Sequence, residues 1–500
     1  MKKWTFLLAV GAAVASFVFG NGARQKDRSG LAMGHRSDNP VGRVQVKKSE
    51  LDALFTFYNE NGMFNGIVLA AENGAVIYRR AFGFSDFEKK TPLDPTAVMS
   101  IGSVAKPFTA LAIMMLKEDG RLSYQDKLTD YFPKFPEYAN AITIRHLLTH
   151  TSGLVDFIND LHLLDSLPEL TDRIGLDSLI SQPAPKFAAG KRYSYCNSGY
   201  FLLGLVIEKI TGKRYREFLE ESVFKPLGMR HTYVLDETVG AIPHRINSYK
   251  FFWEKSDDDL RLKANGNGNM YSTVDDLLRF DQALYSDVLI GQKTLREAYR
   301  TENLTGGGDY LYGFGWRIPK NLPGSIAYHN GGIAGFRAHL WRDLSHKNTL
   351  IVLANNTRIS QDPHILEAAD AIMQGKPWER GKIMASEFFM ENWYFKGFAA
   401  AMKKLRWAAE NDIPHYEFSP DHLNDIGYFF LNRNQMAEAI KVFEFALELI
   451  PGDANLWDSL GEAHMRAGNT VEAIKKYQKA LEIDPDCETA KNALTKLQNK

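Results

Sequence analysis

The sequence predicts an α+β domain followed by an all-α domain of helical repeats. Strand patterns occur at 66–83 and at 325–354, and mainly helical patterns occupy the chain between them. This order predicts an antiparallel sheet assembled from both ends of the domain, with a helical insert. The chain after residue 376 repeats with a fixed period, which is typical of stacked helix pairs.

Length and composition agree with more than one globular domain. The 500 residues exceed what one hydrophobic core usually holds. Hydrophobic residues make up 45% and charged residues 24%, the composition of a soluble globular protein. Basic and acidic residues number 60 each, so the zero net charge gives no reason to expect nucleic acid or an anionic membrane surface as a partner.

The first residues predict export. Residues 1–20, MKKWTFLLAVGAAVASFVFG, combine two lysines, an apolar run and a Val-Phe-Gly ending that suits cleavage after Gly20. We interpret them as a signal peptide, which places the mature protein in the periplasm or outside the cell. The alternative is an uncleaved membrane anchor, because the apolar run is long for a signal core. Residues 21–45 are polar and aperiodic, so we expect a linker.

Residues 46–376 are expected to form the first domain. Its opening hairpin is predicted by Asn73-Gly74, a dipeptide that favours the tight turn between two strands. A capping box from Ser272 to Asp275 predicts the start of a later helix. Helical spacing and terminal glycines predict further helices at 103–120, 198–212 and from about 364 to Gly375, and residues 142–154 are expected to form a short helix that runs into a loop. Strand patterns follow at about 325–330, 335–342 and 348–354.

Residues 377–500 are expected to form the repeat domain, with clear repeats at about 421–454 and 455–488. Four pairs of identical residues differ by 34 in number: Gly427 and Gly461, Ala439 and Ala473, Ala446 and Ala480, and Pro451 and Pro485. This period resembles that of tetratricopeptide repeats, which implies a protein or peptide partner. Because repeats stack mainly on each other, we expect the first domain to fold without this tail.

Ser103 and Lys106 form the first candidate catalytic element, in SIGSVAKPFTALAIMML. They lie one turn apart at the head of a predicted helix, where terminal amides favour a developing anion. A desolvated lysine can lose its proton and act as a base toward the serine. Ser222 and Lys225 share the spacing, but they stand at a predicted helix end and lack that N-terminus.

Tyr195-Cys196-Asn197 is the second element, in GKRYSYCNSGYFLLG. A tyrosine phenol can relay a proton to a leaving group, and an asparagine amide can orient a substrate amide. The third element, His329-Asn330-Gly331-Gly332, ends a predicted strand. Its glycines let a backbone amide approach a substrate oxygen closely, although a hairpin turn beside a structural histidine is the alternative.

Together and in this order, the three elements resemble the serine β-lactamase and penicillin-binding-protein superfamily. The Tyr-x-Asn form is similar to the class C β-lactamase-related branch, which includes esterases and D-amino-acid peptidases. The resemblance covers 45–376 and extends to the blocks IRHLLTHTSGL, FKPLGM, MYSTVDDLLRF and YGFGW. It implies a serine β-lactamase-like fold for the first domain.

The resemblance implies a role for each matched residue. Ser103 resembles the nucleophile, Lys106 its base and Tyr195 the acid/base that serves the leaving group. Asn197 resembles the contact to the substrate amide, and the amides of Ser103 and Gly332 would form the oxyanion hole, with Gly331 beside them.

Histidine is a departure from the family pattern, because His329 occupies the place of a lysine. A neutral histidine holds a substrate carboxylate less well, so we expect esters and uncharged amides to be favoured over β-lactams. We further expect His329 to become cationic in mild acid, with Arg337 as the alternative source of positive charge.

These inferences predict an exported serine hydrolase that acts through an acyl-enzyme on esters or peptide amides. The alternatives are a β-lactamase or D,D-carboxypeptidase of cell-wall metabolism, and a repeat-based scaffold with an inactive hydrolase domain. The expected partners are a small-molecule or peptide substrate and a partner at the repeats, with a membrane only if the signal is uncleaved. No metal-ligand spacing or phosphate-binding glycine loop is found, so no cofactor is implied.

Overall fold

The structure is a computed structural model that describes residues 40–250, 253–301, 310–322, 324–360 and 364–498. The chain divides into two compact units, residues 1–46 and 47–500. The predicted signal peptide and most of the predicted linker lie outside the described residues. Helix α1, Pro40–Glu60, begins inside the segment expected to be a linker. A proline at the first helical position suits this start, because its fixed φ is compatible with a helix.

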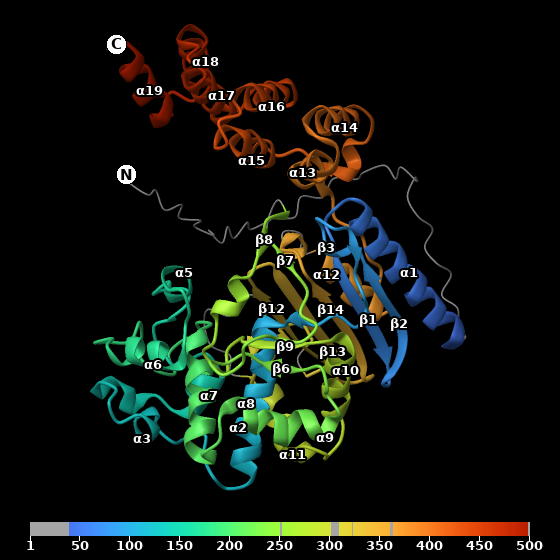
Figure 1. The fold of residues 1–500 in the computed structure, drawn as a ribbon, viewed down its shortest axis with the longest axis vertical. Helices are drawn as coiled ribbons and strands as arrows, with labels where there is room; N and C mark the ends of the chain where they lie inside the picture. The colour runs from blue at the N-terminus through green and yellow to red at the C-terminus, as the bar shows by residue number, and fades with distance from the viewer. Residues whose placement is uncertain (1–39, 251–252, 302–309, 323, 361–363, 499–500) are drawn as a thin grey trace. The chain divides into compact units, whose positions relative to one another are not determined.

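A seven-stranded sheet joins the two ends of the first domain, as the sequence predicts (Figure 1). Its order is β10-β11-β12-β13-β14-β1-β2. The central strands are β12 (Ile326–Ile333), β13 (Phe336–Asp343), β14 (Asn348–Ala354), β1 (Gly66–Glu72) and β2 (Ala75–Phe82). Antiparallel pairing of β1 with β14, from Gly66 opposite Ala354 to Glu72 opposite Asn348, closes the sheet across the sequence. The α+β fold class is confirmed.

The turn between β1 and β2 has the expected geometry. Asn73 and Gly74 both adopt positive φ, 49° and 79°. A two-residue hairpin turn that matches the strand twist requires left-handed backbone at both positions, which asparagine and glycine tolerate.

Two short edge strands were not expected from the sequence. They are β10 (Tyr310–Tyr312) and β11 (Arg317–Pro319), which pair with each other beside β12. A strand of three residues has too few positions for an alternating pattern to be recognised. Both strands matter for the site, because they carry Tyr312 and Arg317.

The helical insert lies between β2 and β12 in sequence (Figure 1). The predicted helix at 103–120 is divided into a 3-10 turn, η1 (Gly102–Ala105), and helix α2 (Lys106–Glu118). The cap of α10 (Val274–Ala283) lies one residue later than predicted. Thr273, and not Ser272, caps this helix by accepting from the Asp276 amide. The other longer helices are α6 (Asp172–Ile180), α7 (Asn197–Thr211) and, after the sheet, α12 (His364–Met373).

Shorter elements complete the insert. The helices are α3 (Leu128–Tyr131), α4 (Ile144–Leu148), α5 (Leu163–Ser166), α8 (Tyr215–Leu219), α9 (Lys225–Leu227) and α11 (Gln292–Leu295). The strands are β3 (Phe84–Asp86), β4 (Thr91–Pro92), β5 (Met99–Ser100), β6 (Tyr233–Val234), β7 (Ser248–Tyr249), β8 (Lys255–Ser256) and β9 (Met270–Ser272). Of these strands, β5 pairs with β9, and β5 ends two residues before Gly102.

Two hydrophobic cores cover the two faces of the sheet. Along β1, Ile67 and Leu69 join the core that contains α2 and α7, whereas Val68 and Ala70 join the core that contains α1 and α12. Successive strand residues point to opposite faces, so a strand buried on both faces reads as one apolar run. One face of the sheet therefore shares a hydrophobic core with α2, the helix that follows Ser103.

The tail consists of antiparallel helix pairs. They are α13 (Ala385–Lys396), α14 (Phe398–Asn411), α15 (Pro420–Leu431), α16 (Met436–Leu449), α17 (Ala454–Arg466) and α18 (Thr470–Ile483), followed by α19 (Glu488–Gln498). The repeated glycines have a packing reason. A Cβ on Gly427 would lie 2.2 Å from the Phe443 ring, and one on Gly461 would lie 2.8 Å from the Tyr477 ring.

Helix α13 contacts the first domain, contrary to the expectation that the tail packs mainly on itself. Arg358, which follows β14, lies within 2.9 Å of Glu387 as an ion pair, and both side chains are 1% exposed. Glu391 accepts hydrogen bonds from Arg358 and from the Trp253 indole, at 3.3 and 3.0 Å. The core around α1 and α12 continues without a break into the tail helices.

Candidate active site

Ser103 lies in the tight turn η1 at the start of α2. Gly102 before it adopts φ of +47°, a left-handed conformation that glycine accepts without strain. A Cβ on Gly102 would lie 2.7 Å from the amide nitrogen of Gly332. The glycine therefore allows the serine turn and strand β12 to approach each other closely.

Lys106 contacts Ser103 from the first turn of α2. Its Nζ donates to Ser103 Oγ at 2.9 Å, to Asn197 Oδ1 at 3.0 Å and to the Asn267 carbonyl at 2.7 Å. Burial lowers the pKa of Lys106 to about 7, with Asp156 opposing the shift and Arg317 adding to it. A large share of the amine is therefore neutral near pH 7, the form that can accept a proton.

Tyr195 reaches the same oxygen from the segment before α7. Its phenol donates to Ser103 Oγ at 2.9 Å. Lys106 Nζ lies 5.0 Å from the centre of the Tyr195 ring. The serine hydroxyl oxygen therefore contacts two groups that can exchange protons with it, which is the geometry that nucleophilic catalysis requires.

Asp156 orients Asn197 and is a site residue that the sequence did not reveal. Its carboxylate accepts from the Asn197 backbone at 2.8 Å and from the Asn197 side-chain amide at 3.0 Å. These bonds fix the amide so that Oδ1 faces Lys106. An aspartate 41 residues away from its partner belongs to no short motif, so only the fold brings the two together.

Strand β12 lies against the serine turn at Gly331 and Gly332. A Cβ on Gly331 would lie 1.9 Å from the Ile101 carbonyl oxygen and 3.1 Å from the Ser103 amide nitrogen. Only glycine fits there, because side-chain atoms do not approach backbone that closely. The two amides expected to bind an oxyanion, those of Ser103 and Gly332, thus belong to segments in direct contact.

The surroundings of His329 contradict the expectation that this residue becomes cationic in mild acid. Its Nδ1 donates to the Asn330 carbonyl at 2.7 Å, so its Nε2 accepts from the Tyr312 phenol at 2.9 Å. Burial, and next the Arg317 charge, hold the pKa of His329 well below its usual value. The ring is 0% exposed, so it stays neutral and supports the strand from inside.

Arg317 supplies a fixed positive charge that the sequence did not assign to the site. Its guanidinium carbon lies 5.7 Å from the centre of the Tyr195 ring. The alternative cation, Arg337, donates instead to the carbonyls of Ala334 and Phe336 at 3.1 and 2.7 Å, which secures the turn after β12. Strand β11, between β10 and β12, therefore places the permanent charge beside Tyr195.

The competing sequence candidates lie in other surroundings. Ser222 lies in the π-helical turn η3 (Glu220–Phe224), and Lys225 is exposed. Cys196 is buried with its sulfur against the Leu154 carbonyl at 3.6 Å, and burial raises the pKa of its thiol to about 12. Neither Ser222 nor Cys196 has the contacts of Ser103.

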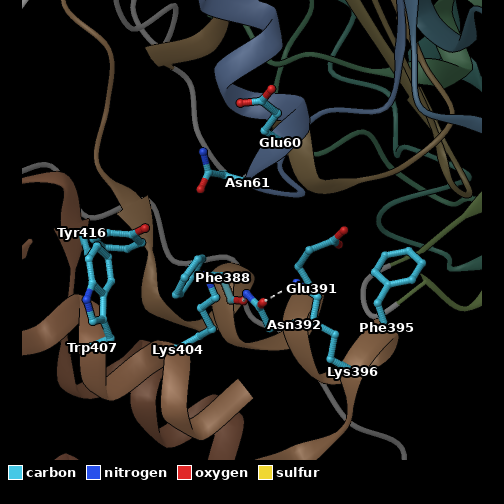
Figure 2. Close-up of a pocket in the computed structure, with 10 residues that line it drawn as sticks. All are labelled: Glu60, Asn61, Phe388, Glu391, Asn392, Phe395, Lys396, Lys404, Trp407 and Tyr416. Carbon is cyan, nitrogen blue, oxygen red and sulfur yellow. Dashed lines mark hydrogen bonds between the residues drawn. The ribbon is translucent and has the colours of Figure 1, made fainter. Parts of the chain in front are cut away.

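A cavity of about 320 Å³ lies away from these residues, where α1 ends near α13 and α14 (Figure 2). Its lining includes Glu60, Glu391 and Trp407, and none of the residues around Ser103. Within the described part of the chain, no cluster of three histidine, cysteine, aspartate or glutamate side chains could hold a metal ion.

Comparison with known proteins decides the family. Residues 51–372 match the Beta-lactamase family, which is well over half of the chain. The chain belongs to the Beta-lactamase family. It is accordingly a serine hydrolase related to penicillin-binding proteins, with a tetratricopeptide repeat matched at residues 454–487.

Proteins similar to this chain include penicillin-binding proteins and an amidase. A penicillin-binding protein of Bacillus subtilis (strain 168) is 35% identical over 360 residues, covering 67% of this chain and 78% of its own. The octameric penicillin-binding protein homologue of Pyrococcus abyssi superposes with a TM-score of 0.58 at 25% identity, covering 68% of this chain and 78% of its own. The D-amino acid amidase of Ochrobactrum anthropi has a TM-score of 0.57 at 23% identity, covering 66% and 99%, and thus shares the fold.

Proposed function

We propose that this serine hydrolase is exported and cleaves esters or peptide amides through an acyl-enzyme on Ser103. The observation that supports this most is the convergence of Lys106 Nζ and the Tyr195 phenol on one oxygen, each at 2.9 Å. A dead remnant acting only as a scaffold has no physical need to keep a buried lysine whose pKa is lowered to about 7.

The acylation step uses the two groups in turn. Neutral Lys106 accepts the Ser103 proton as Oγ forms a bond to the substrate carbonyl carbon. The resulting oxyanion binds the amides of Ser103 and Gly332. When the carbon–nitrogen or carbon–oxygen bond breaks, Tyr195 protonates the leaving group and is reprotonated from Lys106. In net, Ser103 loses one proton and the departing amine or alcohol gains one, while Lys106 and Tyr195 return to their starting protonation states.

Deacylation reverses the proton path with water in place of the leaving group. Water gives a proton to the same pair as it attacks the acyl carbon, and that proton returns to Ser103 Oγ when the acid departs. Asn197, held by Asp156, is positioned to contact the substrate amide.

Two relatives support the choice between substrates. The D-amino acid amidase with the same fold favours amides of D-amino acids as a substrate class. The Bacillus subtilis relative favours, as a second candidate, a D,D-peptidase of the cell wall. Neutral His329 gives no cation for a β-lactam carboxylate, so β-lactamase activity is the least favoured.

The proposal of export rests on the signal-peptide pattern of residues 1–20. No helix among the described residues is long and apolar enough to span a membrane.

Labelling of Ser103 tests the proposal. Ser103→Ala should abolish turnover of an aryl ester and covalent labelling by a fluorophosphonate, because no other described serine has its contacts. Ser222→Ala is the matched control and should leave both unchanged.

Each result of the labelling gel has a distinct meaning. Fluorophosphonate labelling without fluorescent-penicillin labelling supports the ester and amide hydrolase. Labelling by both reagents favours the cell-wall peptidase, and labelling that persists in Ser103→Ala contradicts the nucleophile assignment. A protein that neither reagent labels is the repeat-based scaffold.

A further inference from the structure

His150 is a buried residue beside the catalytic tyrosine to which the proposed mechanism gives no part. It follows α4 and is 1% exposed. Its backbone adopts φ of +57°, in the left-handed region that residues other than glycine seldom occupy. Such a conformation persists only where the surrounding contacts hold it.

Those contacts lie on both sides of Tyr195. The His150 carbonyl accepts from the Ser194 amide at 2.9 Å. The His150 ring Nδ1 accepts from the Cys196 amide at 3.1 Å. One residue therefore binds the amides immediately before and after the tyrosine, and the left-handed backbone lets both its carbonyl and its ring reach the same segment.

The His150 ring also packs against the tyrosine itself. The centres of the His150 and Tyr195 rings lie 4.3 Å apart with a tilt of 37°. Tyr312, whose phenol contacts His329, lies 4.4 Å away on centres. The ring thus limits rotation of the phenol that donates to Ser103.

The tautomer follows from the contact to Cys196. Because Nδ1 accepts a hydrogen bond, the proton of the neutral ring is on Nε2. Burial, and then the charge of Lys106, hold the pKa of His150 well below its usual value. The acceptor at Nδ1 is therefore retained through the neutral pH range.

We propose that His150 is a positioning residue that holds the Tyr195 phenol on Ser103 by binding the backbone on both sides of it. This rests on the proposed function, in which Tyr195 carries the proton to the leaving group. Misplacing that phenol costs turnover while leaving substrate binding nearly intact.

Substitutions at His150 in the full chain separate the acceptor from the ring. His150→Phe keeps a ring and removes the acceptor. His150→Asn keeps an acceptor the same number of bonds from the backbone and tolerates positive φ. His150→Gln moves the acceptor one bond further. His162→Phe is the matched control, because His162 also has positive φ, 51°, and its side chain is 66% exposed.

The readout is kcat per active site for an aryl ester, with sites counted by the end point of fluorophosphonate labelling. His150→Phe should lower kcat about 10- to 100-fold with little change in KM, and His150→Asn should restore most of it. His162→Phe should stay within about twofold of wild type. A merely structural role would reduce the number of labelled sites and the Tm, but would leave kcat per site unchanged.

Three results would overturn the inference. The first is a wild-type kcat per site in His150→Phe. The second is an equal loss of kcat per site in His150→Asn and His150→Phe. The third, which applies if His150→Phe does not fold, is an equal kcat per site in His150→Asn and His150→Gln. Ser103→Ala is assayed in parallel. Full activity in that variant would refute the proposed function, whereas its inactivity beside a fully active His150→Phe would refute only the role of His150.

Discussion

In the proposed mechanism, the protonation state of Lys106 decides when Ser103 can react. Burial lowers the pKa of this amine to about 7, and the Arg317 charge lowers it further than burial alone would. The neutral amine is the form that can accept the Ser103 proton, so we expect activity to be lost as pH falls through that pKa. The base is active near neutrality because of desolvation and a neighbouring cation.

We expect kcat/KM for an uncharged ester to rise with pH along a limb centred near 7. Arg317→Met removes a positive charge that disfavours protonated Lys106, so the limb should move to higher pH. Arg296→Met, at an exposed arginine in η6 (Arg296–Tyr299), should leave the limb in place. A pH–rate profile of the three proteins checks this. A limb that stays put or moves to lower pH in Arg317→Met would contradict the assignment of the titrating group to Lys106.

Tyr195 and Cys196 are neighbours with opposite surroundings. Tyr195→Phe should lower kcat by about 10²-fold or more, because it removes the proton carrier and keeps the ring. Cys196→Ser should be nearly neutral, since a hydroxyl can donate to the Leu154 carbonyl that the sulfur now contacts. Steady-state kinetics of both variants check this. A cysteine mechanism would replace this one if Cys196→Ser were inactive and Tyr195→Phe were not.

Short-range patterns made part of the site predictable. Ser103 and Lys106 are one helical turn apart, and Tyr195 and Asn197 flank one residue, so their spacing is visible in the sequence. Asp156, His150 and Arg317 reach the site only through the fold. The charge of His329 was predicted incorrectly, because the sequence does not show that its ring is fully buried.

Helix α10 is tied to the sheet by two ion pairs of different burial. Asp281 accepts from Arg342 on β13 and from Thr349 on β14, and all three side chains are 0% exposed. Asp275 pairs with Arg79 on β2 at 2.9 Å, where the side chains are 30% and 42% exposed. The same helix and sheet thus offer a buried pair and an exposed one.

We expect the buried pair to dominate stability. Asp281→Asn leaves Arg342 charged and buried without a counter-ion, which costs about 3–5 kcal/mol of unfolding free energy. Asp275→Asn should cost about 0–1 kcal/mol, because water solvates Arg79. Thermal unfolding of both variants against wild type checks the difference. Equal Tm values for the two variants would show that water or a rearranged partner compensates the buried arginine.

Secondary-structure elements were predictable where local chemistry determines their ends. Asn73-Gly74 predicted a turn, and Gly212 ends α7 in the left-handed conformation that glycine favours. The capping residue of α10 was misassigned because Ser272 and Thr273 both suit the position, and only the backbone shows which hydroxyl accepts. Strands β10 and β11 were missed because three residues carry no readable period.

At the scale of the whole molecule, the order of strands and the repeat period predicted the two folds, but side-chain contacts between the two domains were not predictable. Arg358 and Glu387 are 29 residues apart in number and neither belongs to a motif. Their pairing places α13 against the first domain, across the domain boundary that the sequence predicts after residue 376. The Tyr58 phenol also accepts from the Gly381 amide at 2.9 Å, on the first-domain side of this contact.

A chain that ends at Gly381 should therefore be less stable than the sequence suggests. It retains Arg358, which is 1% exposed, but loses both Glu387 and Glu391, and it uncovers the apolar core shared with α13. An uncompensated buried charge alone costs about 3–5 kcal/mol. A chain that ends at Pro451 keeps α13 to α16 and the ion pairs, so its first unfolding transition and its ester hydrolysis per active site should match wild type. Soluble yield, Tm and active-site titration compare the two. If the chain ending at Gly381 had a wild-type Tm and activity, α13 would contribute nothing to the first domain and the expectation of independent folding would be restored.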